Sequence, residues 1–365
     1  MFYYLYPKLR EIFFPFNVFR YITFRAAMAG VTALLLTTLL GPLVIRKLGK
    51  FKVRERIGKE ACPELKNLHQ GKEGTPTMGG ILILIGILLP VILWTDLSNR
   101  FIILVFLSTI WLGLLGFIDD YLKVVRKKPS GLRAKTKLTG QLLLGFLIGL
   151  YLYYYPLNPE HGTELAFPFF KHLFFPLGWL YIPFVMLVIV GTSNAVNLTD
   201  GLDGLAIGCV VIAASAYAGM SYVTGNSKFS EYLGLVPIAG SGELTIFLIA
   251  IVGAGLGFLW FNSHPAQIFM GDTGSLALGG VLGIVAVIIK QELLLLIVGG
   301  VFVMEALSVI IQVVSYRWRK KRVFKIAPLH HHFELQGWAE SKVIIRFWIL
   351  AVIFALFSLS TLKLR

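Results

Sequence analysis

Ten long apolar runs restrict the fold of this chain more than any other feature of its sequence. Nine of them contain no Asp, Glu, Lys or Arg, and the remaining one contains only Glu305. As helices, runs of roughly 17–25 residues cross the hydrocarbon core of a membrane, which is about 30 Å thick. We therefore predict an all-α fold, a polytopic membrane bundle of ten transmembrane helices. The runs are 26–45, 74–95, 101–118, 138–159, 172–199, 205–227, 244–263, 273–289, 293–316 and 347–362.

These runs leave little of the 365 residues for a separate soluble part, so we predict a single membrane domain, 1–365. Apolar residues make up 56% of the chain, which is above the range of soluble domains. Only the last run is short, and residues 343–345 extend it if the Arg346 side chain reaches the interface. The N-terminal stretch lacks the cleavage pattern of a signal peptide. Cys62 and Cys209 are too few for a disulfide framework.

The distribution of basic residues predicts the orientation of the bundle. The net charge is +15, and the loops 46–72, 123–137 and 317–346 together hold 24 Lys and Arg, whereas the four even-numbered connections hold one each. The positive-inside rule therefore places the odd-numbered loops in the cytoplasm and both termini in the periplasm. This pattern assigns the basic charge to a membrane protein rather than to one that binds nucleic acid. The predicted cytoplasmic loops are about 46–73, 123–137, 198–204, 262–273 and 317–342.

Two adjacent carboxylates, Asp119 and Asp120, end the third run in the motif GFIDDYLK, 116–123. The C-terminal end of a helix carries the negative end of its dipole, so this is an unfavourable position for anions. An ordinary charged cap with Lys123 as its i+4 partner is one interpretation. Two acids against the dipole favour instead a third group, such as a cation.

A second polar motif, NAVNLTDGLDGLA (194–206), connects the fifth and sixth runs. Its amide and carboxylate side chains recur every third residue, which predicts one helical face. Two glycines interrupt the helix and allow a ligand to approach the backbone. A simple polar turn is the alternative. The four side chains are Asn194, Asn197, Asp200 and Asp203, and the glycines are Gly201 and Gly204.

The motif FNSHPAQIFMGDTGSLALGG (261–280) places Asp272 and Thr273 where the eighth run begins. Backbone amides at a glycine-rich helix start bind phosphate, and we expect that role here, with a plain N-cap as the alternative. The motif KIAPLHHHFELQGW (325–338) adds three successive histidines, which cannot all face one way and so do not predict a zinc site. Glu305, inside the ninth run, predicts a functional or internally paired acid, and Gln312 shares its face.

All of these motifs lie on the predicted cytoplasmic side, together with the weaker motif KEGTPTMGG, 72–80. Mg²⁺ prefers a few carboxylates together with substrate phosphates, so Asp119, Asp120 and Asp272 suit a pyrophosphate-bearing substrate. Apolar grooves between helices suit a lipid substrate. We therefore predict an enzyme that joins a soluble nucleotide compound to a lipid phosphate by phosphoryl transfer.

The motifs, in order along the whole chain, resemble those of the phospho-N-acetylmuramoyl-pentapeptide transferases, a branch of the polyprenyl-phosphate sugar-phosphate transferase superfamily. The motifs TPTMGG (75–80) and APLHHHFELQGW (327–338) indicate this branch. The resemblance implies a multi-pass protein of the bacterial inner membrane with its active site on the cytoplasmic face. It implies transfer of phospho-N-acetylmuramoyl-pentapeptide from its UDP derivative to undecaprenyl phosphate, giving lipid I and UMP, with Mg²⁺ as cofactor.

The resemblance also implies roles for individual residues. Asp119, Asp120 and Asp272 are the expected metal ligands and, with His330, the expected catalytic residues; Phe269 is expected to stack on uracil. The expected substrate-binding residues are Lys72, Thr77, Asn197, Asp200, Gly201, Leu202, Asp203, Asn262, Phe269, Gln312, His331 and His332.

The role of Asp119 stays open between base, nucleophile and positioning group. A phosphate monoester has a second pKa near 6, so it is mostly dianionic at pH 7 and has little proton to give up. This favours positioning over general-base action, and a two-step route through an aspartyl-phosphate is a further alternative.

Two other functions remain possible from the residues alone. A sister enzyme using UDP-N-acetylglucosamine would share the acidic motifs, although the histidine triplet argues against it. A transporter or lipid flippase would place ionisable groups near the membrane centre, where only Glu305 lies. The lipid-facing surfaces also allow a homodimer.

Overall fold

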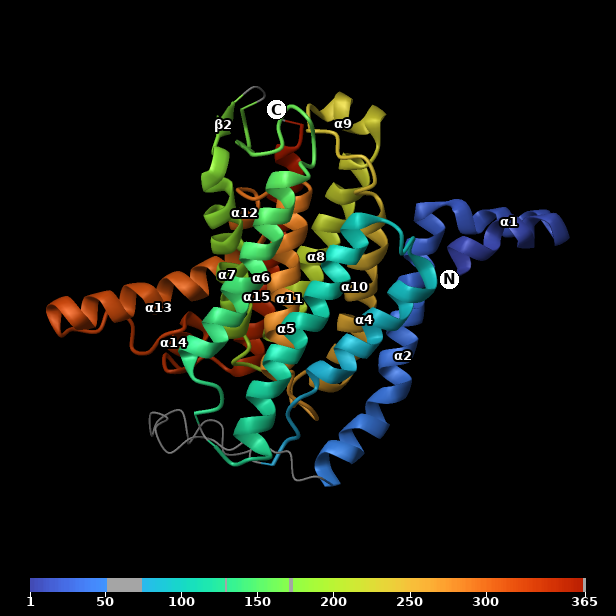
Figure 1. Ribbon diagram of the computed structural model, residues 1–365. Coiled ribbons are helices and arrows are strands. Elements are labelled where there is room, and N and C mark those ends of the chain that lie inside the picture. Colours follow the sequence, from blue (N-terminus) through green and yellow to red (C-terminus); the bar gives the residue numbers. More distant parts are fainter. Residues whose placement is uncertain (51–73, 129, 171–172, 364–365) are drawn as a thin grey trace.

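The computed structural model describes residues 1–50, 74–128, 130–170 and 173–363, and most of them are helical (Figure 1). Among these residues, eight helices are long and apolar enough to cross a membrane. They are α2 (Ile22–Lys50), α5 (Arg100–Val124), α7 (Tyr181–Thr199) with the preceding turn η3 (Gly178–Leu180), α8 (Leu205–Thr224), α10 (Glu243–Asn262), α11 (Gly271–Ile288), α13 (Gly300–Arg319) and α15 (Glu340–Thr361). The all-α, polytopic class predicted from the apolar runs is therefore confirmed.

Two further apolar helices pack in the same bundle. α4 (Gly80–Trp94) has only 15 residues, and α6 (Ala134–Tyr154) has 21. α4 packs against α2 and α10, whereas α6 packs against α7. All ten predicted runs thus contain a helix, but the number of membrane crossings and the side that each end faces stay predictions.

Helix α11 forms the centre of the bundle, because every residue from Asp272 to Ile288 is buried. It packs mainly against α5 and α7, while α10 lies between α2 and α8 (Figure 1). The sequence of α11 suits this place, since it is apolar on all sides and rich in glycine and alanine, and small residues let membrane helices pack closely. The functional residues at its first turn therefore stand on a rigid element.

The ninth apolar run differs from the prediction of one continuous span. It forms a short helix, α12 (Leu295–Val298), and then α13, which points away from the bundle in Figure 1. The break falls at Gly299, where the missing side chain lowers the cost of leaving helical geometry. By contrast, α15 continues through Arg346, as the extension of the last run predicted.

Both chain ends lie at the end of the bundle where α4 and α8 finish. The Met1 ammonium donates to the carbonyl of Ile92 at 2.7 Å, and Lys363 lies over the ring of Tyr232. The same end holds α1 (Phe2–Ile12), η1 (Phe14–Arg20), α9 (Ser227–Leu233) and an antiparallel pair of short strands, β1 (Glu164–Ala166) and β2 (Phe174–Pro176). The acidic motifs gather at the opposite end, with the short helix α14 (Leu329–Glu334).

Candidate active site

Asp119, Asp120 and Asp272 meet where the end of α5 crosses the start of α11. Their carboxylate oxygens lie within 4.8 Å of one another, and all three residues are buried. The two helices approach this closely because Gly116 has no side chain: a Cβ there would lie 2.2 Å from the Asp272 carbonyl oxygen. The glycine that precedes the acid pair in the sequence is thus what brings the third carboxylate to it.

Asp120 caps the first turn of α11. Its Oδ1 accepts from the Asp272 amide at 3.1 Å, and its Oδ2 accepts from the Thr273 amide at 2.9 Å and the Thr273 hydroxyl at 2.6 Å. An anion at the positive end of the α11 dipole is stabilised, which offsets its unfavourable place at the end of α5. The expectation that these two amides bind phosphate is wrong, because both donate to Asp120.

Asp119 and Asp272 share two lysines. Lys123 Nζ lies 2.6 Å from Asp119 Oδ2 and 3.0 Å from Asp272 Oδ2, and Lys137 Nζ lies 2.5 Å from the same oxygen of Asp272. Asp119 Oδ1 also accepts from the Leu132 amide at 2.6 Å. Three acids and two lysines leave one net negative charge in this cluster. One interpretation of the sequence predicted Lys123 as the i+4 partner of Asp119. The sequence did not distinguish Lys137 from the other basic residues of the loop 123–137.

The donor set of this cluster fits Mg²⁺, which prefers a few carboxylate oxygens and leaves room for phosphate and water. Asp119 and Asp272 are better placed than Asp120 to hold a cation. Asp119 and Asp272 already share one cation, the Lys123 ammonium, whereas the Asp120 oxygens accept three hydrogen bonds from α11.

Asn197, near the end of α7, extends the cluster. With its amide nitrogen toward Asp272, it donates to Asp272 Oδ1 at 3.0 Å and accepts from Lys137 Nζ at 3.2 Å. Asn194 instead donates to the Gln141 side chain on α6. Helix α7 ends at Thr199, so Asp200 and Asp203 lie beyond it. The prediction that the four polar residues share one helical face is therefore wrong, whereas the predicted interruption is present, with Gly204 at a φ of 78°.

A second polar group surrounds Asp203, three residues beyond Asp200. His264 Nδ1 lies 3.1 Å from Asp203 Oδ2 and 3.5 Å from Glu340 Oε2, and Glu340 Oε1 accepts from the Asp203 amide at 3.0 Å. Asn262 closes the group, because its side chain accepts from the Gly204 amide and donates to the Ile268 carbonyl. Three separate segments are thus tied together. The sequence reasoning missed His264 and Glu340, although His264 lies within a quoted motif.

His330 lies against Gly201, which is in the segment that connects Asn197 to Asp203. Its side chain is fully buried, and a Cβ on Gly201 would lie 2.3 Å from its Nε2, which has no hydrogen-bond partner among the described residues. Glu305 holds it from the other side: its carboxylate accepts from the backbone amides of Leu329 at 2.8 Å and His330 at 3.2 Å. The acid inside the ninth run is therefore internally paired, as one of its two interpretations held.

The other residues of the triplet face elsewhere. His331 Nδ1 lies 2.8 Å from Glu334, and His332 Nδ1 accepts from the Lys325 amide. Gln312 binds the backbone of residues 323–324 through three hydrogen bonds rather than the acidic cluster. These contacts shape the loop that carries His330.

The segment TPTMGG forms one wall of the site. The Phe269 amide donates to the Pro76 carbonyl, and the Gly79 and Gly80 amides donate to Phe269 and Met270, each at 2.8 Å. Thr77 is buried, whereas the Phe269 side chain is partly exposed and open to a stacking partner. Lys72 lies outside the residues that the structure describes. Leu202 is buried, and Asp200 and Gly201 are partly exposed.

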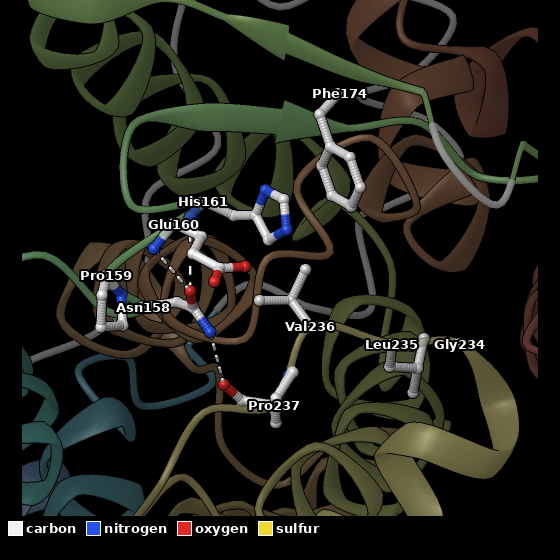
Figure 2. Close-up of a pocket in the computed structure, with 9 residues that line it drawn as sticks. All are labelled: Asn158, Pro159, Glu160, His161, Phe174, Gly234, Leu235, Val236 and Pro237. Carbon is white, nitrogen blue, oxygen red and sulfur yellow. Dashed lines mark hydrogen bonds between the residues drawn. The ribbon is translucent and has the colours of Figure 1, made fainter.

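A pocket of about 490 Å³ lies at the other end of the bundle (Figure 2). It forms between the connection that follows α6 and the one that precedes α10, and its lining includes His161, Phe174 and Val236. His161 stacks on Phe174 with ring centroids 4.0 Å apart. None of the predicted site residues lines it, so it is separate from the acidic cluster.

A helical membrane bundle whose buried carboxylates share two lysines at one end has the site chemistry of a membrane enzyme that acts on phosphate groups. Residues 102–290 match the family described as Glycosyl transferase family 4, and residues 72–84 match the Phospho-N-acetylmuramoyl-pentapeptide-transferase signature 1. Proteins named phospho-N-acetylmuramoyl-pentapeptide-transferase from Citrifermentans bemidjiense and Koribacter versatilis are 56% and 53% identical over 100% and 99% of both chains. A protein of the same name from Endomicrobium trichonymphae is 51% identical over 100% of both chains. The chain belongs to the phospho-N-acetylmuramoyl-pentapeptide-transferase family, which confirms the resemblance found in its motifs.

Proposed function

We propose that this protein transfers phospho-N-acetylmuramoyl-pentapeptide from UDP-N-acetylmuramoyl-pentapeptide to undecaprenyl phosphate, giving lipid I and UMP for peptidoglycan synthesis. The observation that carries the proposal is the buried pair Asp119 and Asp272 with its two shared lysines. Such a site manages the charge of two phosphate groups that must approach one another. Relatives that are named phospho-N-acetylmuramoyl-pentapeptide-transferase and match over the full chain support the choice of the transferred group.

In the reaction, a phosphate oxygen of the lipid forms a bond to the β-phosphorus of the donor. The bond from that phosphorus to the bridging oxygen breaks, and UMP leaves with the oxygen. Because a phosphate monoester is mostly dianionic at pH 7, no proton has to be removed from the nucleophile. Asp119 therefore acts by positioning, and Lys123 and Lys137 offset the charge of the approaching phosphates.

Asp119 and Asp272, with Asp120 as a third oxygen donor, are the residues that would hold Mg²⁺. When bound, the ion would act as a Lewis acid that neutralises charge on the phosphoryl oxygens. Asp120 keeps the first turn of α11, and with it Asp272, at the end of α5. His330 Nε2, which is buried and has no hydrogen-bond partner in the described part of the chain, would donate to the donor pyrophosphate.

The nucleoside would lie along residues 200–203, with the partly exposed ring of Phe269 as its stacking partner. Thr77, Asn197, Asn262 and Lys72 belong to the same proposed pocket. Gln312, His331 and His332 would act on the substrate indirectly, through the loop that carries His330.

We place the protein in the bacterial inner membrane with ten spans, periplasmic termini and the site on the cytoplasmic face. The count of basic residues in the loops supports this orientation, and two of them, Lys123 and Lys137, contact the acidic cluster. A soluble UDP-linked donor meets the site from the cytosol, and the acceptor arrives within the membrane. A homodimer remains part of the proposal on the strength of the broad lipid-facing surface.

The test is UMP release by the purified protein in detergent with undecaprenyl phosphate and one of two donors. We expect release with UDP-N-acetylmuramoyl-pentapeptide, only when Mg²⁺ is present, and none with UDP-N-acetylglucosamine. Release with the simpler donor alone would assign the protein to the sister reaction. No release with either donor would overturn the proposed reaction.

A further inference from the structure

A groove with a basic rim and an apolar floor lies between α14 and α15. Its volume is about 300 Å³, and it is lined by Phe333, Trp338, Arg346, Phe347, Ile349 and Leu350. Five of these six side chains are aromatic or aliphatic, and Arg346 is the exception. None of them was assigned to the acidic cluster, the Asp203 group or the nucleoside pocket, so the groove is separate from the proposed reaction.

The Arg346 side chain is ordered by an aromatic ring rather than by an acid. Its guanidinium carbon lies 4.1 Å from the centre of the Trp338 ring, and Lys342 Nζ lies 5.8 Å from the same centre. Within the described part of the chain, the Arg346 side chain makes no hydrogen bond or salt bridge. A guanidinium stacked by its face keeps its N–H edge available, and that edge matches a phosphate with two parallel hydrogen bonds.

The groove changes from charged to apolar along α15. Arg346 lies six residues after the helix start at Glu340, which is about 9 Å along the axis, and Leu350 lies about 15 Å along it. Ile349 and Leu350 are exposed at the surface of the bundle. The groove therefore presents the Arg346 cation and the Trp338 indole near the start of α15, and the aliphatic side chains of Ile349 and Leu350 farther along the helix. An amphiphile with an anionic head and acyl chains has the same order.

The groove and the proposed site share the short helix α14. Phe333 stacks on Trp338 with ring centroids 4.6 Å apart on the groove side. His330, in the preceding turn, packs against Gly201 on the site side. A molecule that fills the groove would therefore press on the helix that carries His330.

We propose that this groove binds one anionic glycerophospholipid, with its phosphate on Arg346 and its acyl chains along Phe347, Ile349 and Leu350. Charge complementarity selects an anionic lipid over a zwitterionic one, because the rim offers Arg346 and Lys342. The bound lipid holds α14 in place and thereby supports the proposed reaction. The binding itself does not depend on that reaction.

The experiment is native mass spectrometry of the full-length protein in detergent, titrated with phosphatidylglycerol, phosphatidylcholine or undecaprenyl phosphate. We expect one phosphatidylglycerol to bind more tightly than phosphatidylcholine, and Arg346→Gln to weaken that binding about tenfold, which corresponds to about 1.4 kcal/mol. Trp338→Leu removes the ring that orders the guanidinium and lowers the same preference. Arg319→Gln, a change at an exposed arginine outside the groove, is the matched control and leaves it unchanged.

Three results would overturn the proposal. The first is that Arg346→Gln keeps the preference for phosphatidylglycerol over phosphatidylcholine. The second is that Arg319→Gln lowers this preference as much as Arg346→Gln does. The third is that undecaprenyl phosphate displaces phosphatidylglycerol from the Arg346-dependent site at equal concentration. UMP release provides the second readout: phosphatidylglycerol should stimulate the unaltered protein and not Arg346→Gln, while the two proteins remain equal in phosphatidylcholine. If neither protein releases UMP but the lipid preference still depends on Arg346, the proposed reaction fails and the lipid site stands.

Discussion

Gly116→Ala tests whether the close crossing of α5 and α11 creates the acidic cluster. A Cβ at this position would lie 2.2 Å from the Asp272 carbonyl oxygen and 2.6 Å from the Thr273 amide nitrogen. These are backbone atoms of a helix start, so no side chain can rotate out of the way. An ordinary contact needs about 3.5 Å, so the two helices must separate by roughly 1 Å.

The cost has two parts. Alanine gains about 1 kcal/mol of helix propensity over glycine, whereas overpacking in a well-packed core costs about 1–3 kcal/mol, so the net loss of stability is small, at most about 2 kcal/mol. The effect on rate is larger. A shift of about 1 Å moves Asp272 away from Asp119 and Lys123, and a misplacement of that size costs about 100-fold in rate.

The assay is UMP release at saturating substrates, together with thermal unfolding in detergent. Gly191→Ala is the matched control, because Gly191 is also helical, on α7, and a Cβ there meets nothing within 4 Å. We expect the control to keep full activity and equal or higher stability. A Gly116→Ala protein with more than half of the normal rate would show that the clash is absorbed without moving the carboxylates, and that the close helix crossing does not create the site.

Three further predictions concern neighbouring residues. Asp120→Asn should lower the free energy of unfolding by about 1.5–3 kcal/mol, because one hydrogen bond from the charged Asp120 cap to α11 is lost. A loss of stability smaller than that caused by Asp119→Asn would contradict the capping role of Asp120. His264→Asn should raise the KM for the UDP donor about fivefold, which is the equivalent of losing the one hydrogen bond between His264 and Asp203, and should change kcat less than twofold. A fall in kcat with an unchanged KM would contradict this prediction. Glu305→Gln should lower kcat and leave the KM for the donor unchanged, because the Leu329 or the His330 amide at the start of α14 loses its acceptor. A normal kcat would show that Glu305 does not position His330.

The fold was predictable because the apolar runs are long and nearly free of charge, and each of them contains a helix. Two departures have local causes. The start of the second run pairs with residues 269–270 through Pro76, Gly79 and Gly80, so α4 begins only at Gly80. The ninth run breaks at Gly299, a position that hydrophobicity alone does not distinguish from its neighbours.

The site was predictable in its residue types but less so in its contacts. Asp119 and Asp272 stood out because acids are rare in such a chain. That Asp120 caps α11 could not be foreseen, since the two residues of each cap bond lie more than 150 positions apart. His264 and Glu340 were missed for the same reason, because each is a common polar residue until the fold brings it to Asp203.

The role of the carboxylate pair in the reaction is tested by UMP release from Asp119→Asn and Asp272→Asn, together with calorimetric binding of the UDP donor. We expect Asp119→Asn to lose turnover but to bind the donor nearly as well as the unaltered protein. We expect Asp272→Asn to lose both turnover and any response to Mg²⁺. Near-normal turnover in Asp119→Asn, or a rate that still rises with Mg²⁺ in Asp272→Asn, would contradict the assignment of this carboxylate pair to the reaction.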